Sequence, residues 1–262
     1  MTSISLHRPP AWGVVAVEQL RAVATALRKE AIGFVIVSVL FFALGIRAAF
    51  ADVGSAVPAF RIAFGSSTGL PVVVLALLIP LGVWRGEDPA RRAYHWAMPV
   101  PRMRHTLTKV AAGLVWAMVA VAAYLLLILA LSLSVGAITG RPIPTTANLW
   151  EWAVPFTASG ISYLFASAII VGLRHPWRWI LGCVPTIFVL LVFARPLGLG
   201  WLADGARALA NGYYGMGAAT GANLLGADGR ASVERWIVAT LLWGSVVSIA
   251  MLVAAHRHIE EA

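Results

Sequence analysis

Long apolar runs separated by short polar segments dominate the pattern along this chain. The runs cover about residues 31–50, 62–83, 110–137, 153–173, 180–195 and 236–255. Roughly 20 apolar residues let a helix cross a hydrocarbon layer of ~30 Å, and backbone in lipid must be hydrogen-bonded within the segment. Barrel strands would be ~10 residues long and would alternate in polarity, unlike these runs. The pattern predicts an all-α polytopic membrane protein with six transmembrane helices in a domain over residues 31–262.

The segment before the first run is amphipathic. From Trp12 to Glu30, a helical period places polar side chains on one face and apolar side chains on the other. The polar face holds Glu18, Arg21, Thr25, Arg28 and Lys29, and the apolar face holds Ala16, Val17, Leu20, Val23, Ala24 and Leu27. We expect residues 1–30 to form a cytoplasmic tail and an amphipathic helix in the membrane interface, with its basic face towards anionic headgroups. The alternative is a cytoplasmic extension of the first span.

Composition and charge fix the expected orientation. The chain is 60% hydrophobic and 12% charged, with a net charge of +9. Most Lys and Arg residues lie in short segments between apolar runs, which follows the positive-inside rule and does not suggest nucleic-acid binding. With both termini in the cytoplasm, 13 of the 20 Lys and Arg residues are inside and seven outside. We therefore expect cytoplasmic N and C termini.

The most charged segment, residues 84–109, lies between the second and third spans. Asp88 followed by Pro89 is a favourable helix start, since an Asp side chain caps the helix and proline is tolerated in its first turn. A short helix over Pro89–Ala97 would end before Pro99, which disfavours helical backbone in the preceding residue. The next helix is expected to restart near Arg102. The alternative is an ordinary positive loop anchored by tryptophans.

This segment resembles the first cytoplasmic loop of ABC transporter type 2 permeases. Pro99, Val100, Arg102 and Lys109 match the family motif, whereas Pro101 replaces a more usual small or polar residue. The amphipathic N-terminal helix, six spans and an irregular outer segment match the family layout. The resemblance implies that the short helix is a coupling helix that docks onto an ATP-binding subunit. The partner-binding residues would be Asp88, Pro89, Arg91, Arg92, Tyr94, Met98, Pro99 and Arg102.

The chain carries no ATPase motif of its own. A phosphate-binding G-x-x-x-x-G-K-[ST] loop needs Lys before Ser or Thr, but Lys29 precedes Glu30 and Lys109 precedes Val110. We expect this chain not to be an enzyme and to bind no cofactor or metal, with ATP and Mg held by a partner subunit. The resemblance further implies a second permease copy, as a homodimer or heterodimer, in the bacterial cytoplasmic membrane.

The segment over residues 195–235 is rich in glycine and follows a fifth run that is short for a full crossing. Interrupted apolar helices often line translocation pathways. The hypothesis is a re-entrant or surface-lying outer gate around residues 197–225, and the alternative is a flexible outer loop. The candidate gate residues are Pro196, Gly212, Tyr213, Tyr214 and Gly215.

The preferred function is the transmembrane subunit of an ABC exporter that moves a hydrophobic or amphipathic substrate. The alternative is an ATP-independent membrane scaffold or assembly factor whose basic loop binds a partner. A membrane enzyme is disfavoured because the runs contain almost no ionisable residues, which mark function inside membranes. Small residues at Ser159, Gly160 and Ser162 are better explained by close helix packing than by catalysis.

Overall fold

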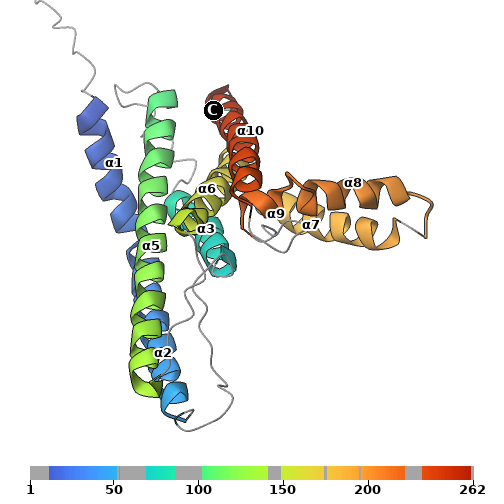
Figure 1. Ribbon diagram of the computed structural model, residues 1–262. Helices are drawn as coiled ribbons and strands as arrows, with labels where there is room; N and C mark the ends of the chain where they lie inside the picture. The colour runs from blue at the N-terminus through green and yellow to red at the C-terminus, as the bar shows by residue number, and fades with distance from the viewer. Residues whose placement is uncertain are drawn as a thin grey trace, which may run out of the picture.

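The computed structural model is helical and contains no strand within the residues that it describes (Figure 1), which are 12–51, 53, 69–85, 102–140, 149–173, 176–194, 196–221 and 232–260. The helices are α1 (Trp12–Ala26), α2 (Arg28–Ala51), α3 (Gly69–Trp84), α5 (Arg102–Thr139), the 3-10 helix η2 (Leu149–Ala153), α6 (Val154–Gly172), α7 (Pro176–Phe193), α8 (Gly200–Asn211), α9 (Met216–Ala219) and α10 (Val233–Glu260).

Among the described residues, four helical stretches are long and apolar enough to cross a membrane. They are Arg28–Ala51, Met103–Thr139, Trp150–Gly172 and Val233–Arg257. These stretches coincide with the first, third, fourth and sixth predicted runs, so the chain is an all-α membrane protein. The second and fifth runs correspond to the shorter helices α3 and α7. Helix α7 begins at Pro176, before the start of the fifth run, and proline is well suited to a first helical turn.

Helix α6 is the centre of the bundle. It packs along α3 and α10, and it also contacts α5. In Figure 1 the hairpin of α7 and α8 projects away from this bundle, and α2 runs beside α5. The main core joins Ala117 of α5, Tyr163 and Val171 of α6, and Met251 and Ala255 of α10.

One polar contact fixes the α5–α6 crossing. The Tyr163 side chain is completely buried, and its hydroxyl donates a hydrogen bond of 3.0 Å to the Val110 carbonyl oxygen. Gly113 makes this approach possible, because a Cβ there would lie 2.0 Å from the tyrosine hydroxyl. A glycine therefore permits the close packing that an aromatic side chain requires.

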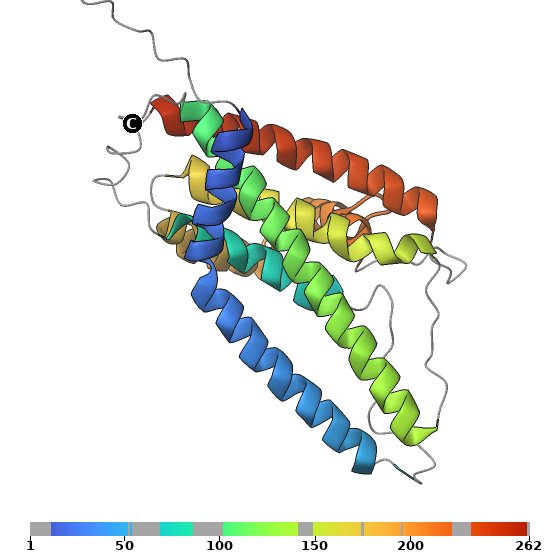
Figure 2. The ribbon, with the colours of Figure 1, turned by 90° about the vertical axis from the view of Figure 1, so that its left-hand side faces the viewer.

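The helix directions alternate so that several ends gather at one side. Figure 2 shows α1 crossing the bundle at the side where α5 begins and where α3 and α10 end. We call this side the Trp84 end. The opposite side, where η2 meets the start of α10, is called the Trp236 end. Residues 86–101, which hold the predicted coupling helix, connect α3 to α5 and lie outside the described residues.

The amphipathic N-terminal helix is shorter than expected and packs partly against protein. It ends at Ala26, and α2 begins at Arg28. Val23 and Leu27 are buried against Val83 of α3 and Ala112 of α5. Val17, which was assigned to the same apolar face, is 47% exposed. The predicted apolar face thus packs against the bundle through Leu20, Val23 and Leu27, whereas Val17 remains largely exposed.

Candidate functional site

Basic side chains stack on tryptophans at the Trp84 end. The Lys109 ammonium lies 4.5 Å from the centre of the Trp84 ring. This contact joins the start of α5 to the last residue of α3, and so brackets the 86–101 segment. The Arg104 guanidinium lies 4.1 Å from the centre of the Trp12 ring and joins α5 to α1. Such cation–π contacts are worth about 0.5–2 kcal/mol, depending on burial.

Two further contacts tie the same helices together. The Glu30 carboxylate of α2 lies 2.7 Å from the guanidinium of Arg85, which directly follows α3. The indole nitrogen of Trp116, on α5, donates a hydrogen bond of 3.1 Å to the Leu20 carbonyl oxygen of α1. Helices α1, α2, α3 and α5 are therefore connected at the Trp84 end by contacts between side chains and between side chain and backbone.

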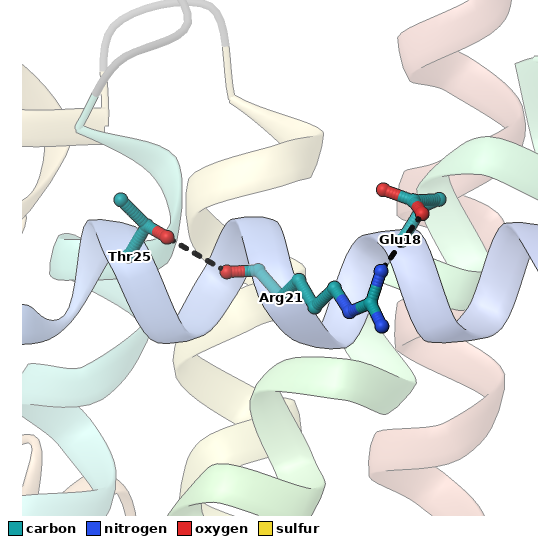
Figure 3. A network of polar contacts seen from close by, with 3 residues as sticks. All are labelled: Glu18, Arg21 and Thr25. Atoms are coloured by element: carbon teal, nitrogen blue, oxygen red, sulfur yellow. Dashed lines mark hydrogen bonds and ion pairs between the residues drawn. The ribbon is translucent and has the colours of Figure 1, made fainter.

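The polar face of α1 points away from these contacts. Figure 3 shows the Arg21 guanidinium beside the Glu18 carboxylate, at 3.5 Å, and the Thr25 hydroxyl bonded to the Arg21 carbonyl oxygen at 3.0 Å. All three residues are exposed. The residues of this face are exposed, and its surface ion pair contributes little to stability because water screens it.

Most of the predicted coupling residues are not among the residues that the structure describes. Asp88, Pro89, Arg91, Arg92, Tyr94, Met98 and Pro99 lie outside the described residues. Arg102 is the first residue of α5, as expected from a helix that restarts there. The predicted site is thus defined only by its flanks, Trp84–Arg85 and the first turns of α5.

Four of the predicted gate residues, Gly212–Gly215, form a compact turn at the Trp236 end, whereas Pro196 lies at the opposite end of helix α8. Pro196 precedes α8, whereas residues Gly212–Gly215 connect α8 to α9. A Cβ at position 212 would lie 2.2 Å from the Ala208 carbonyl oxygen, and one at position 215 would lie 2.9 Å from the Leu209 carbonyl oxygen. Both glycines are required by close backbone packing at the end of α8.

A buried arginine binds this turn. Arg235, in the first turn of α10, is 5% exposed. Its Nε donates a short hydrogen bond to the Tyr213 carbonyl oxygen, and its Nη2 donates one of 3.1 Å to the Gly212 carbonyl oxygen. The guanidinium also lies 4.9 Å from the centre of the Tyr213 ring. Charged hydrogen bonds of this kind are worth about 1.5–3 kcal/mol each.

A second residue of α10 extends the attachment. The indole nitrogen of Trp243 donates a hydrogen bond of 3.1 Å to the Tyr214 carbonyl oxygen. Beyond the turn, Ala218 and Ala219 of α9 are buried against Ile161 of α6 and Ala239 of α10. The turn and α9 are consequently packed onto the bundle.

Sequence reasoning missed Arg235 as a functional candidate. In the charge count it is one of the seven Lys and Arg residues assigned to the outer side. Helix N-termini disfavour cations, so an arginine in the first turn of α10 is a weak signal for a specific anionic or carbonyl partner. Nothing in the sequence pattern identifies the turn around Tyr213 as that partner.

The described part of the chain offers no group of three or more His, Cys, Asp or Glu side chains that could hold a metal ion. Comparisons with known protein families, with curated proteins and with solved structures find no match.

Proposed function

We propose that this chain is the transmembrane subunit of an ABC exporter for a hydrophobic or amphipathic substrate. In this proposal it has six spans and cytoplasmic termini, and it works with a second permease copy in a bacterial cytoplasmic membrane. A separate subunit binds ATP and Mg and docks on the segment between α3 and α5. The proposal starts from the resemblance of residues 84–109 to the coupling loop of type 2 permeases.

The contacts at the Trp84 end are the observation that supports it. In this proposal, movement of residues 86–101 is transmitted to α3 through Trp84 and Arg85 and to α5 through Lys109. The Glu30–Arg85 pair and the Arg104–Trp12 contact extend the connection to α2 and α1. A docking loop that has to move several helices together needs connections of this kind.

The test is affinity purification of the tagged full chain in mild detergent, followed by mass spectrometry. We expect an ATP-binding protein to accompany the native chain and to be lost when Tyr94→Ala is combined with Arg102→Glu. Arg207→Glu is the matched control, because Arg207 is an exposed arginine on α8, far along the chain from the loop. It should leave the partner bound.

The outcomes separate the two functional alternatives. Loss of the partner with both variants would show a general effect of charge or folding and would remove the assignment to the loop. Absence of any ATP-binding partner from a well-folded native chain would contradict the exporter and support the scaffold.

The gate hypothesis remains part of this proposal and centres on the turn over Gly212–Gly215. If the turn opens during transport, its Arg235 and Trp243 contacts must break and form again. We expect a cysteine in place of Tyr214, in a Cys183→Ser background, to react with a membrane-impermeant maleimide at rates that differ between nucleotide-free and nucleotide-bound complexes. Equal rates in every nucleotide state would contradict a gating role.

A further inference from the structure

A lateral groove lies between α2 and α5 and has no role in the exporter proposal. Its volume is about 400 Å³. It is lined by Phe34, Val35, Ser38 and Phe42 of α2 and by Ala123 and Leu127 of α5. Apart from the Ser38 hydroxyl, these side chains offer only hydrocarbon, so the groove suits an apolar chain.

One end of the groove is closed by a close helix contact. A Cβ at Gly45 would lie 2.8 Å from a methyl carbon of Leu131, which is completely buried. Ala49, one turn further along α2, is 1% exposed. In contrast, Val35 is 57% exposed. The two helices are therefore in contact near Gly45, and the groove opens towards the N-terminal end of α2.

The groove has the length of one membrane leaflet. From Phe34 to Phe42 the helix rises ~12 Å, at ~1.5 Å per residue. Half of a hydrocarbon core of ~30 Å is ~15 Å. Arg28 lies ~9 Å before Phe34 along the helix, which corresponds to the headgroup layer when Phe34 lies at the edge of the hydrocarbon. Arg28, Val35 and Phe42 are seven residues apart, so they share one side of α2.

Basic charge is concentrated at the open end. Arg28 and Lys29 are both exposed. The two acidic residues nearest in sequence face other cations, since Glu18 lies 3.5 Å from Arg21 and Glu30 lies 2.7 Å from Arg85. Among the residues that the structure describes, no acidic side chain pairs with Arg28 or Lys29. An anionic group beside them would meet positive charge, which attracts anionic headgroups at about 1 kcal/mol per residue.

A second copy of the chain fits the groove less well. In a two-fold symmetric pair with parallel membrane orientation, joining two α2 helices along this face would bring Arg28 of one copy towards Arg28 of the other. Like charges facing each other oppose such an interface. An anionic lipid matches both parts of this surface, because its hydrocarbon chain fits the groove and its negative charge lies at the open, basic end.

We propose that the α2–α5 groove binds an acyl chain of one anionic phospholipid, whose phosphate lies against Arg28 and Lys29. The site is independent of the exporter proposal, because it depends only on α2, α5 and the leaflet that contains the start of α2.

The first experiment maps lipid contacts on the full chain in nanodiscs. Phosphatidylglycerol and phosphatidylcholine that carry the same photoactivatable acyl chain are compared at equal amounts, and labelled peptides are identified by mass spectrometry. We expect labelling of residues 34–42 to be at least threefold greater with phosphatidylglycerol. Equal labelling by the two lipids would overturn the headgroup assignment.

Matched substitutions then separate the groove from the general lipid surface. Ser38→Trp fills the groove and should lower labelling of the facing α5 peptide at least threefold. Val37→Trp is the control, because Val37 is 65% exposed and does not line the groove. Equal labelling of that peptide in the two tryptophan variants would contradict the site.

The headgroup contact is tested at the exposed end, where substitution leaves the packing unchanged. Arg28→Gln should reduce the preference for phosphatidylglycerol towards one, whereas Arg21→Gln, which removes the same charge beside Glu18, should preserve it. An unchanged preference in Arg28→Gln would overturn the proposal. So would efficient disulfide-linked dimers of Ser38→Cys in a Cys183→Ser background, because they would show a second copy in the groove.

Discussion

Helices α2 and α6 are both apolar enough to cross a membrane, yet they occupy opposite environments. In the most apolar stretch of α2, 11% of the residues are buried within the protein, and in that of the Trp150–Gly172 stretch 56% are buried. The stretch with the higher mean hydropathy, that of α2, is thus the more peripheral one. Lipid removes the usual penalty for exposed hydrocarbon, so apolar content alone does not identify the core of a membrane protein.

Small and hydroxyl-bearing residues distinguish the two helices. Ser159, Ser162 and Ser167 of α6 are at most 2% exposed, and the Ser159 hydroxyl bonds to the Pro155 carbonyl oxygen at 2.7 Å. These small side chains permit close approach of neighbouring helices, and the Ser159 hydroxyl is satisfied within its own helix. On α2 the buried positions are also small, but they are limited to Gly45 and Ala49. Substitutions on the crowded side of the bundle should therefore cost more than matched substitutions at exposed or open positions.

The largest effect is expected from adding bulk to α6. Ala158 is completely buried, so Ala158→Leu should lower the free energy of unfolding by about 3 kcal/mol, the upper end of the usual cost of overpacking. Ala31→Leu on α2, at an exposed position, should change it by less than about 0.5 kcal/mol. Reversible denaturation of the purified chain in mixed micelles measures both. Similar costs would show that α2 is packed as tightly as α6.

The sequence pattern located four helices of membrane-crossing length but did not show which helices are neighbours. The fourth run was expected at 153–173 and α6 covers Val154–Gly172, because hydropathy directly reports the length that crosses lipid. Of the small residues predicted to pack closely, Ser159 and Ser162 are buried, whereas a Cβ at Gly160 would meet only the Met118 methyl group, at 3.9 Å. The pattern could not show that α6 would be central, since helix order in a bundle depends on side-chain fit between segments far apart in sequence.

The candidate sites were predictable to different degrees. The restart of helix at Arg102 followed from local proline chemistry, and the glycines at 212 and 215 signalled an irregular turn. The hydrogen bonds from Arg235 to the Gly212 and Tyr213 carbonyl oxygens were not predictable, because they link residues 22 and 23 positions apart through their tertiary arrangement. Local sequence rules describe individual helices and turns, whereas contacts between distant segments depend on the tertiary arrangement.

A smaller effect is expected at the α5–α6 crossing. Gly113→Ala places a methyl group 2.0 Å from the position of the Tyr163 hydroxyl, and the buried ring has little room to move. The expected loss is about 2 kcal/mol, within the range for overpacked cores. Gly244→Ala is the control, since a Cβ there meets no atom within 4 Å.

The double variant tests whether the hydroxyl is responsible. Tyr163→Phe alone should cost about 1 kcal/mol through loss of its hydrogen bond to Val110. Combined with Gly113→Ala, it should cost clearly less than the sum of the two single changes, because the clashing atom has been removed. Additive costs would show that the methyl group is accommodated elsewhere.

The smallest effect concerns the close contact between α2 and α5 at Gly45. Gly45→Ala brings a methyl group within 2.8 Å of a Leu131 methyl carbon, whereas Gly33→Ala, on the same helix, meets no atom within 4 Å. Alanine improves on glycine inside a helix by about 0.5–1 kcal/mol, so Gly33→Ala should stabilise the chain, and Gly45→Ala should lose that gain through the clash. We expect the two variants to differ by about 1 kcal/mol in unfolding free energy. If they are equally stable, α2 is free to shift along α5, and the closed end of the groove is not fixed at Gly45.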